Sequence, residues 1–279
     1  MPKDIYEEIV ALRSKGIPAA LATIIARKGA TPRKDSTKML IYADGRQLGT
    51  IGGGSIEAEV SREALQILET GKPKLLTLDL SAVDPEESAL VCGGSMEVYV
   101  EPVLPDPTLF IFGAGHVSKA IAEVARMIGF KVAVIDDRPK YANPERFPYA
   151  DAFYVDSWEA SLQKIDVSEM SYLFIATRSH QLDLDCLRFA VQSPAKYIGM
   201  LGSNKKNKAL LELLEKEGID PSKFDRVSVP VGLDIGSETP EEIAVSIAAE
   251  LIAVRKKQNI RLIKEAMRKA KNAVASTVG

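Results

Sequence analysis

The sequence contains few of the residues that most metal and redox sites are built from. It has two cysteines, two histidines and one tryptophan among 279 residues. So few cysteines argue against a disulfide framework and fit a reducing compartment. No Cys-x-x-Cys pair is present, so we expect no structural zinc site.

Long apolar runs and a large charge of one sign are also missing. No stretch of about 18 apolar residues is present to span a membrane, and the first eight residues are too acidic for a signal peptide. A net charge of −2 gives no reason to expect nucleic acid as a partner. The hydrophobic content of 46% supports a real core, and the length suggests two domains. We therefore expect a cytoplasmic protein that binds neither membranes nor nucleic acid.

The pattern of predicted elements changes near residue 104. The part before it is α+β, with helices predicted over 3–15 and 56–69 and strands over 19–26, 37–42, 46–50, 74–80 and 95–100. Prolines at positions 102, 105 and 107 exclude a helix or a central strand there. The sequence therefore predicts an N-terminal α+β domain over residues 1–104 and a second domain over 105–279.

Strands and helices alternate in the second part, as a parallel sheet requires. Apolar runs predict strands at 109–112, 130–135, 152–155, 172–176, 197–201 and 227–229, and helices lie between most of them. Thr239-Pro240-Glu241-Glu242 is typical of a capped helix start, and helical, increasingly basic sequence follows. The fold class is therefore α/β, with a Rossmann-like doubly wound sheet whose default strand order is 3-2-1-4-5-6.

The first strand of that sheet leads into Gly113-Ala114-Gly115, and a helix follows. Gly113 permits a tight turn, and Gly115 lets the backbone approach a phosphate at the helix N-terminus. Asp136 ends the next strand, 21 residues after Gly115 (136 − 115), close to the offset of a ribose-binding acid. Ser118 replaces the usual third glycine. The pattern indicates a nucleotide-binding unit, although the same elements also serve as a scaffold.

Three further stretches suit an anion. Gly52-Gly53-Gly54 precedes a predicted helix, and Gly202-Ser203 ends the fifth Rossmann strand beside two lysines. Arg33 is a loop arginine that could form a bidentate contact with phosphate or carboxylate. The alternatives are ordinary tight connections and a solvated arginine.

His116 and His180 follow the carboxyl ends of the first and fourth Rossmann strands, which are neighbours in the default order. We expect both to face one crevice as acid/base groups, metal ligands or donors to an anion. Asp183 would orient the His180 ring or lie on the helix surface.

Cys92 lies in Val91-Cys92-Gly93-Gly94, where an accessible sulfur suits thiolate chemistry or a soft metal, unless it is simply buried. Cys186 lies in an apolar helix and is predicted to be core.

Taken in order, these stretches resemble the XdhC/CoxI family. The N-terminal signature is carried by Ala19–Thr23, Gly29–Arg33, Lys38–Leu40 and Gly49–Glu57, and Cys92-Gly93-Gly94 with Glu101-Pro102 resembles the end of that domain. The C-terminal domain is carried by Phe112–Val117, Asp136-Asp137-Arg138, Thr177–His180, Gly199–Ser203 and Pro230–Gly236. The resemblance covers nearly the whole chain, which makes it more specific than any single motif.

The resemblance implies a maturation factor for molybdenum hydroxylases of the xanthine dehydrogenase type. Such proteins bind the molybdenum cofactor, protect it while a cysteine desulfurase exchanges an oxo ligand for sulfur, and deliver it to the apoenzyme. This implies a chaperone more than a turnover enzyme, with no catalytic residue, and a homodimer. Cys92 is the implied metal ligand. The predicted cofactor-binding residues are Arg33, Gly52, Gly53, Gly54, Cys92, Gly93, Gly94, Gly113, Gly115, His116, Asp136, Asp137, His180, Gly202 and Ser203.

Two alternatives stay open at this point. One is an NAD(P)-dependent oxidoreductase that holds a nucleotide with Gly113, Gly115 and Asp136. The other is a metal-binding or adaptor protein that uses His116, His180 and Cys92 as ligands. The Rossmann crevice is thus expected to hold either a nucleotide or part of the molybdenum cofactor.

Overall fold

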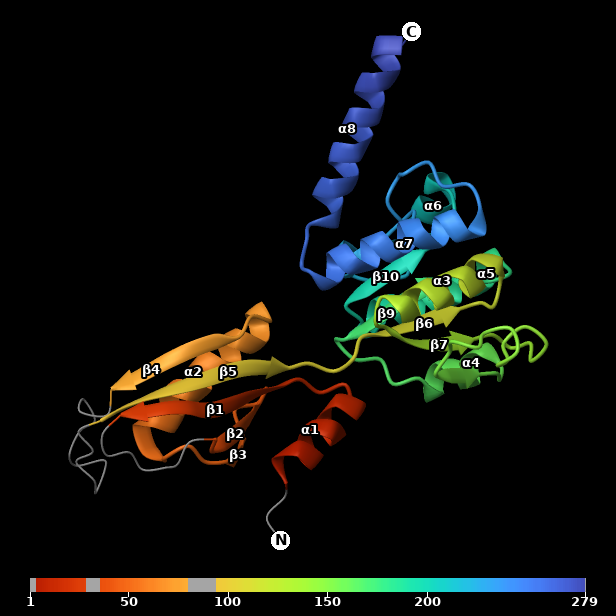
Figure 1. The fold of residues 1–279 in the computed structure, drawn as a ribbon. Coiled ribbons are helices and arrows are strands. Elements are labelled where there is room, and N and C mark those ends of the chain that lie inside the picture. Colours follow the sequence, from red (N-terminus) through yellow and green to blue (C-terminus); the bar gives the residue numbers. More distant parts are fainter. Residues whose placement is uncertain (1–3, 29–35, 80–93, 279) are drawn as a thin grey trace. The chain divides into compact units, whose positions relative to one another are not determined.

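The computed structural model describes residues 4–28, 36–79 and 94–278, with side chains described up to residue 270. The chain forms two compact units, Met1–Pro105 and Asp106–Gly279 (Figure 1). The first unit contains an antiparallel sheet and the second a parallel one. The predicted fold class, α+β followed by a Rossmann-like sheet, is confirmed.

The first unit is a five-stranded sheet with a helix on each face. Its order is β3-β2-β1-β5-β4, and the strands are β1 (Ala19–Lys28), β2 (Lys38–Tyr42), β3 (Gln47–Gly49), β4 (Lys74–Asp79) and β5 (Ser95–Val103). Successive β1 side chains alternate between faces, so Ala20, Ala22 and Ile24 pack against helix α2 (Gly54–Thr70). Helix α1 (Ile5–Ser14) packs against Ala19 and Leu21 on the other face.

Strand β5 continues past the point where the sequence predicted its end. It runs through Pro102 to Val103, and Pro102 pairs with Ala20 of β1. The pairing of β5 with β4 stops at Val100. Beyond Val100, β5 has a neighbouring strand on only one side among the described residues, and an edge of this kind tolerates a proline, which has no N–H to donate. The predicted end of this strand at residue 100 was therefore too early. The prediction that proline excludes a central strand there is confirmed, because β5 is an edge at that point.

The second unit is a six-stranded parallel sheet of order β11-β10-β9-β6-β7-β8. Its strands are β6 (Thr108–Phe112), β7 (Lys131–Ile135), β8 (Ala152–Tyr154), β9 (Ser171–Ile175), β10 (Tyr197–Met200) and β11 (Val227–Ser228). Counted from β6, this is the predicted order 3-2-1-4-5-6. Strands β6 and β9 therefore lie side by side in the centre of the sheet.

Helices cover both faces of this sheet. One core contains α3 (His116–Met127) and α7 (Pro240–Arg255), and the other contains α4 (Trp158–Lys164), α5 (His180–Gln192) and α6 (Asn204–Lys216) (Figure 1). The predicted cap of α7 is present, because Thr239 and Glu242 each bond the other's backbone N–H. Helix α8 (Ile260–Val278) is basic. No helix in the described part is long and apolar enough to cross a membrane.

A buried polar cluster ties α8 to the sheet. The Glu250 carboxylate on α7 is fully buried and accepts a hydrogen bond from the Tyr197 hydroxyl at 2.8 Å. Lys264 Nζ lies 2.9 Å from the other Glu250 oxygen and also donates to Ser228 Oγ at 2.6 Å. Lys264 is therefore part of an internal ion pair.

Candidate anion-binding site

The carboxyl ends of β6, β7 and β9 meet at one edge of the parallel sheet, as such strands must. Their turns surround a cavity of about 250 Å³. The lining residues are Ala114, Gly115, His116, Arg138, Tyr141, Arg146, Ala176, Thr177 and Arg178. Three of the nine are arginines, so the cavity suits a negatively charged ligand.

The two glycines of the first turn have different roles. Gly113 has a φ of +102°, and a Cβ atom there would lie 2.2 Å from the carbonyl oxygen of Ala176. Only glycine therefore lets the turn approach the end of β9 this closely. Gly115 has a φ of −78°, and a Cβ atom there would meet no atom within 4 Å. Space beside Gly115 is thus open at the N-terminus of α3, where no side chain caps the helix.

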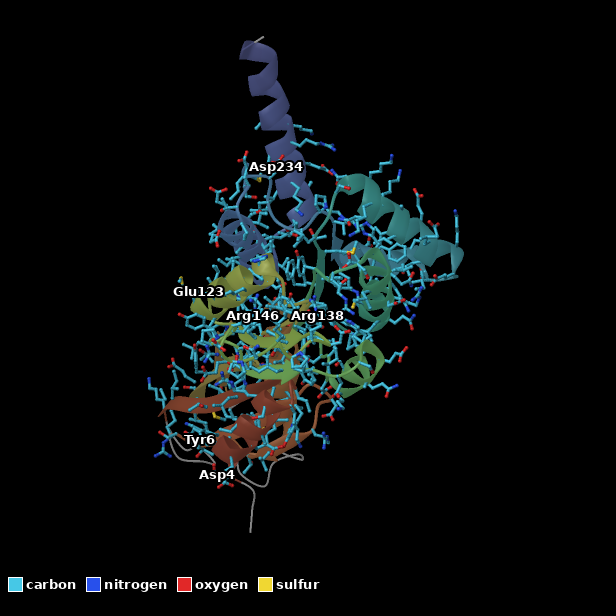
Figure 2. The ribbon with its side chains drawn as sticks, turned by 90° about the vertical axis from the view of Figure 1, so that its right-hand side faces the viewer. Asp4, Tyr6, Glu123, Arg138, Arg146 and Asp234 are labelled. Atoms are coloured by element: carbon cyan, nitrogen blue, oxygen red, sulfur yellow. The ribbon has the colours of Figure 1, made fainter. Side chains whose placement is uncertain are left out.

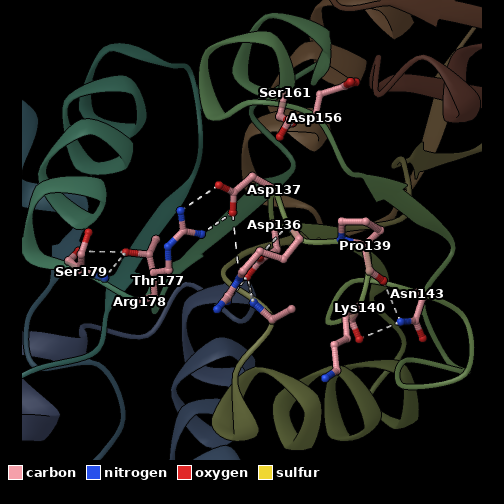
Figure 3. Close-up of polar contacts among 12 residues, drawn as sticks. Asp136, Asp137, Pro139, Lys140, Asn143, Asp156, Ser161, Thr177, Arg178 and Ser179 are labelled. Atoms are coloured by element: carbon pink, nitrogen blue, oxygen red, sulfur yellow. Dashed lines mark hydrogen bonds and ion pairs between the residues drawn. The ribbon is translucent and has the colours of Figure 1, made fainter.

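Asp136 is committed to partners within the protein (Figure 3). It is 1% exposed, and its carboxylate accepts the Ala114 N–H at 2.8 Å. The Arg138 side chain donates to both of its oxygens at 2.8 Å, and the Arg138 backbone N–H donates at 3.1 Å. The hydrogen bond to Asp136 raises the pKa of Arg138 above its ordinary value. Asp136 therefore fixes the glycine turn and aligns Arg138. The predicted contact between Asp136 and a ribose stays a prediction, and a ribose hydroxyl would compete with the hydrogen bonds from Ala114 and Arg138.

Asp137, the next residue, joins the ends of β7 and β9. Both of its oxygens accept hydrogen bonds from the Arg178 guanidinium, one of them at 2.8 Å (Figure 3). These hydrogen bonds hold the pKa of Asp137 below its ordinary value. A bidentate pair of this kind fixes the plane of the guanidinium at the mouth of the cavity.

Arg146 and Tyr141 belong to the cavity and were not found from the sequence. The guanidinium carbons of Arg138 and Arg146 lie 4.2 Å and 5.3 Å from the centroid of the Tyr141 ring. Figure 2 shows the two arginines side by side in the second unit. Both Arg146 and Tyr141 lie in the connection from β7 to β8, which carries no motif. Only the adjacency of Arg138 to Asp136-Asp137 was a signal in the sequence.

The two histidines take different places. His116 begins α3 and lines the cavity. His180 begins α5, is exposed and is not one of the lining residues. Asp183 neither lies on the helix surface nor orients His180. It is buried and accepts hydrogen bonds from the Thr177 N–H at 3.0 Å and the Thr177 hydroxyl at 2.7 Å.

The turn at the end of β10 does not line the cavity. Ser203 caps α6 by accepting the N–H of Lys206, and a Cβ atom on Gly202 would lie 2.8 Å from Asn207 Oδ1. Lys206 Nζ lies 2.7 Å from an oxygen of Asp183. The described contacts of this turn are therefore internal, and its predicted part in anion binding stays a prediction.

The glycine turn of the first unit encloses a carboxylate of the chain itself. Gly52, Gly53 and Gly54 have φ values of +150°, +86° and +62°. One oxygen of Glu57 accepts the Thr50 hydroxyl at 2.5 Å, the Ile51 N–H at 3.0 Å and the Gly53 N–H at 2.9 Å. Burial alone would raise the pKa of Glu57, but these hydrogen bonds bring it below its ordinary value. The donors expected to wrap a phosphate thus already hold an anion.

Several predicted residues lie elsewhere. Arg33, Cys92 and Gly93 fall outside the described residues, and Gly94 directly precedes β5. Cys186 is fully buried, as predicted, and burial raises the pKa of its thiol. Within the described ranges, no three His, Cys, Asp or Glu side chains are placed to hold a metal ion.

Comparison with protein families gives two matches that follow one another along the chain. Residues 12–79 match the model of the XdhC and CoxI family. Residues 109–251 match the model of the XdhC Rossmann domain. The second match spans all the strands and glycine turns that surround the cavity.

Two relatives align with most of this chain. The chain is 36% identical over 253 residues to the uncharacterized protein YqeB of Escherichia coli, covering 90% of this chain and 46% of YqeB. It therefore spans about half of that relative's length. It is 22% identical over 289 residues to the molybdenum cofactor insertion chaperone PaoD of Escherichia coli, covering 86% of this chain and 84% of PaoD.

A solved structure shares the architecture. The crystal structure of a protein from Bacillus halodurans, described as a xanthine dehydrogenase, superposes with a TM-score of 0.51 at 25% identity. The alignment covers 91% of this chain and 96% of that one.

Proposed function

This chain belongs to the XdhC and CoxI family, and on that premise we propose that it is a maturation factor for a molybdenum hydroxylase. It binds the molybdenum cofactor and delivers it to an apoenzyme of the xanthine dehydrogenase type. The observation that carries this proposal is the arginine-lined cavity inside the XdhC Rossmann domain. The names of PaoD and of the Bacillus halodurans protein support the choice of cofactor and client.

The cavity fits the phosphorylated side chain of the pterin. Arg138 and Arg178 are held in fixed orientations by Asp136 and Asp137, so their remaining N–H groups are available without reorganisation. The open space beside Gly115 lets a phosphate oxygen reach the free N–H groups at the start of α3. When bound, the cofactor supplies the molybdenum chemistry of the client enzyme. This chain's residues bind the cofactor and shield it until transfer.

We further propose that the thiolate of Cys92 holds the metal end, as the family resemblance implies. A thiolate is a soft ligand that suits molybdenum. Gly93 and Gly94 would keep it accessible, and Arg33 would be an anion-binding residue of the same unit, whereas the donors of the turn 52–54 already hold Glu57. Cysteine desulfurase would act on the complex while it is held in this way. A cytoplasmic homodimer is part of the same proposal.

The test is cofactor retention by the purified protein. The wild type, Cys92→Ser and a control, Cys186→Ala, would be mixed with molybdenum cofactor and separated by size, and the retained pterin read by fluorescence after oxidation. We expect retention by the wild type and the control and loss in Cys92→Ser. Retention that Cys92→Ser leaves unchanged would remove the thiolate from the proposal. Retention by none of the three would remove the maturation function.

The second candidate function is an NAD(P)-dependent oxidoreductase. It is favoured by the strand–turn–helix at Gly113 and Gly115, which is the phosphate-binding unit of dinucleotide enzymes. This alternative is disfavoured because the Asp136 carboxylate, which would bind the ribose, already accepts hydrogen bonds from Ala114 and Arg138. Saturable binding of NAD by a protein that retains no pterin would establish this alternative.

A further inference from the structure

We propose that Arg146, together with Arg138 across the ring of Tyr141, binds a phosphate monoester, and that this contact decides which ligands the cavity accepts. This deepens the proposed function, on which the choice of a pterin as ligand rests. None of the residue patterns in the sequence pointed to Arg146.

The first argument is charge. The cavity and its edge hold three guanidinium groups and two carboxylates. Asp136 pairs with Arg138, and Asp137 pairs with Arg178. Arg146 has no carboxylate partner in the described part of the chain, so it carries the surplus positive charge. An incoming anion is therefore drawn to Arg146 first.

The second argument is an unmet donor. Nε of Arg146 is buried and has no hydrogen-bond partner among the described residues. Burying such a donor without a partner is unfavourable, and the cost is recovered when an acceptor arrives. Nε and the neighbouring Nη of a guanidinium form the flat pair of donors that two phosphate oxygens accept. Arg146 also lines the cavity, so its guanidinium group borders the space that a ligand would fill.

The third argument is orientation. Arg138 and Arg146 both lie over the ring of Tyr141, at 4.2 Å and 5.3 Å from its centroid. Contact with one aromatic ring limits the rotamers of both side chains and keeps both guanidinium groups beside the same ring. Two preorganised guanidinium groups offer several N–H donors beside one another, which suits the three terminal oxygens of a phosphate monoester.

The fourth argument concerns what the cavity does not offer. Recognition of an unphosphorylated ribose uses a free carboxylate at the end of the second strand. Asp136 occupies that position, and its oxygens already accept four hydrogen bonds from Ala114 and Arg138. Selection therefore falls to the arginines. Two ligands carry the required group: the pterin with its side-chain phosphate, and a dinucleotide with a 2′-phosphate.

Matched pairs of probes test this inference. One pair is the fluorescent oxidised pterin of the cofactor before and after treatment with alkaline phosphatase, and the other pair is NADP and NAD. Binding of all four would be measured by equilibrium dialysis to the full chain as wild type, Arg146→Gln and Arg146→Lys. The control is Arg126→Gln, which removes an equal charge from α3 at an arginine that pairs with Asp151 outside the cavity. Unchanged thermal unfolding would show that each variant is folded.

We expect the wild type and Arg126→Gln to bind the phosphorylated pterin about 10- to 100-fold more tightly than its dephosphorylated form. Arg146→Gln should lose nearly all of this preference, and Arg146→Lys should keep part of it, because the charge stays but the flat donor pair is lost. A preference that Arg146→Gln leaves unchanged would overturn the inference.

The outcomes separate this inference from the proposed function. If the protein retains the cofactor but Arg146→Gln does not alter the phosphate preference, the inference fails and the maturation function stands. If no pterin binds but NADP binds more tightly than NAD in an Arg146-dependent manner, the phosphate site stands and the maturation function fails.

Discussion

The paired glycines at the start of α3 offer a test of how this site is built. Gly113→Ala places a Cβ atom 2.2 Å from the Ala176 carbonyl oxygen at a φ of +102°. The backbone conformation costs about 1–2 kcal/mol for an alanine, and forcing β6 and β9 apart costs roughly 1–3 kcal/mol more. We expect the free energy of unfolding to fall by about 2–5 kcal/mol. That corresponds to a melting temperature lowered by roughly 4–20 °C for a unit of this size.

Gly115→Ala is the matched control, because its Cβ atom would meet no atom within 4 Å and its φ of −78° suits any residue. Its cost should not exceed about 1 kcal/mol, the loss expected for alanine at an N-cap. Trp158 is the only tryptophan of the chain and lies in the second unit. Its fluorescence therefore reports unfolding of that unit. Equal losses of unfolding free energy in the two variants would refute the claim that a side chain clashes at Gly113 and fits freely at Gly115.

Three further variants test other parts of the molecule. Glu57→Gln should lower the free energy of unfolding by about 1–2 kcal/mol at pH 7, measured by circular dichroism melting. Folding lowers the pKa of Glu57, so the difference between wild type and variant should vanish as the pH falls through the pKa of Glu57 in the folded protein. Lys264→Ala should lower the free energy of unfolding by about 3–5 kcal/mol, because it leaves the buried Glu250 carboxylate without its cation. Adding Glu250→Gln should restore part of that stability, measured by Trp158 fluorescence. Burial raises the pKa of Tyr172 to about 12, and its hydroxyl has no partner among the described residues, so Tyr172→Phe should not lower stability in urea. A clear loss for Tyr172→Phe, or a pH-independent cost for Glu57→Gln, would contradict these accounts.

The Rossmann unit was predictable because its elements are local. An apolar run, a Gly-x-Gly turn and a 3.6-residue period each follow from residues close together in the chain. Right-handed crossovers then leave few ways to order the strands, and the order found is the default one. The end of β5 was not predictable in the same way. Whether Pro102 is tolerated depends on where the antiparallel strand β4 begins, and the local sequence around Pro102 does not show that.

The partners of charged side chains were the hardest feature to predict. Asp136 was predicted to face a ligand, yet it bonds Ala114 and Arg138. The glycines of residues 52–54 were predicted to wrap a phosphate, yet Glu57 bonds the same turn. In both places the glycine motif correctly predicted that backbone N–H groups bind an anion. It did not show whether that anion belongs to the protein or to a ligand.

The sequence by itself determined the family, the two kinds of sheet and the place of the phosphate-binding turn, because these depend on periodicity, glycine positions and ordered motifs. Tertiary structure alone decided which charged side chains of the described residues have no partner of opposite charge. Arg146 lies ten residues after Asp136 (146 − 136), in a connection without a motif. It enters the cavity only because the connection from β7 folds back to stack Arg138 and Arg146 on Tyr141. Electrostatic pairing depends on distance in space, and that distance is set once the strands and their connections are packed.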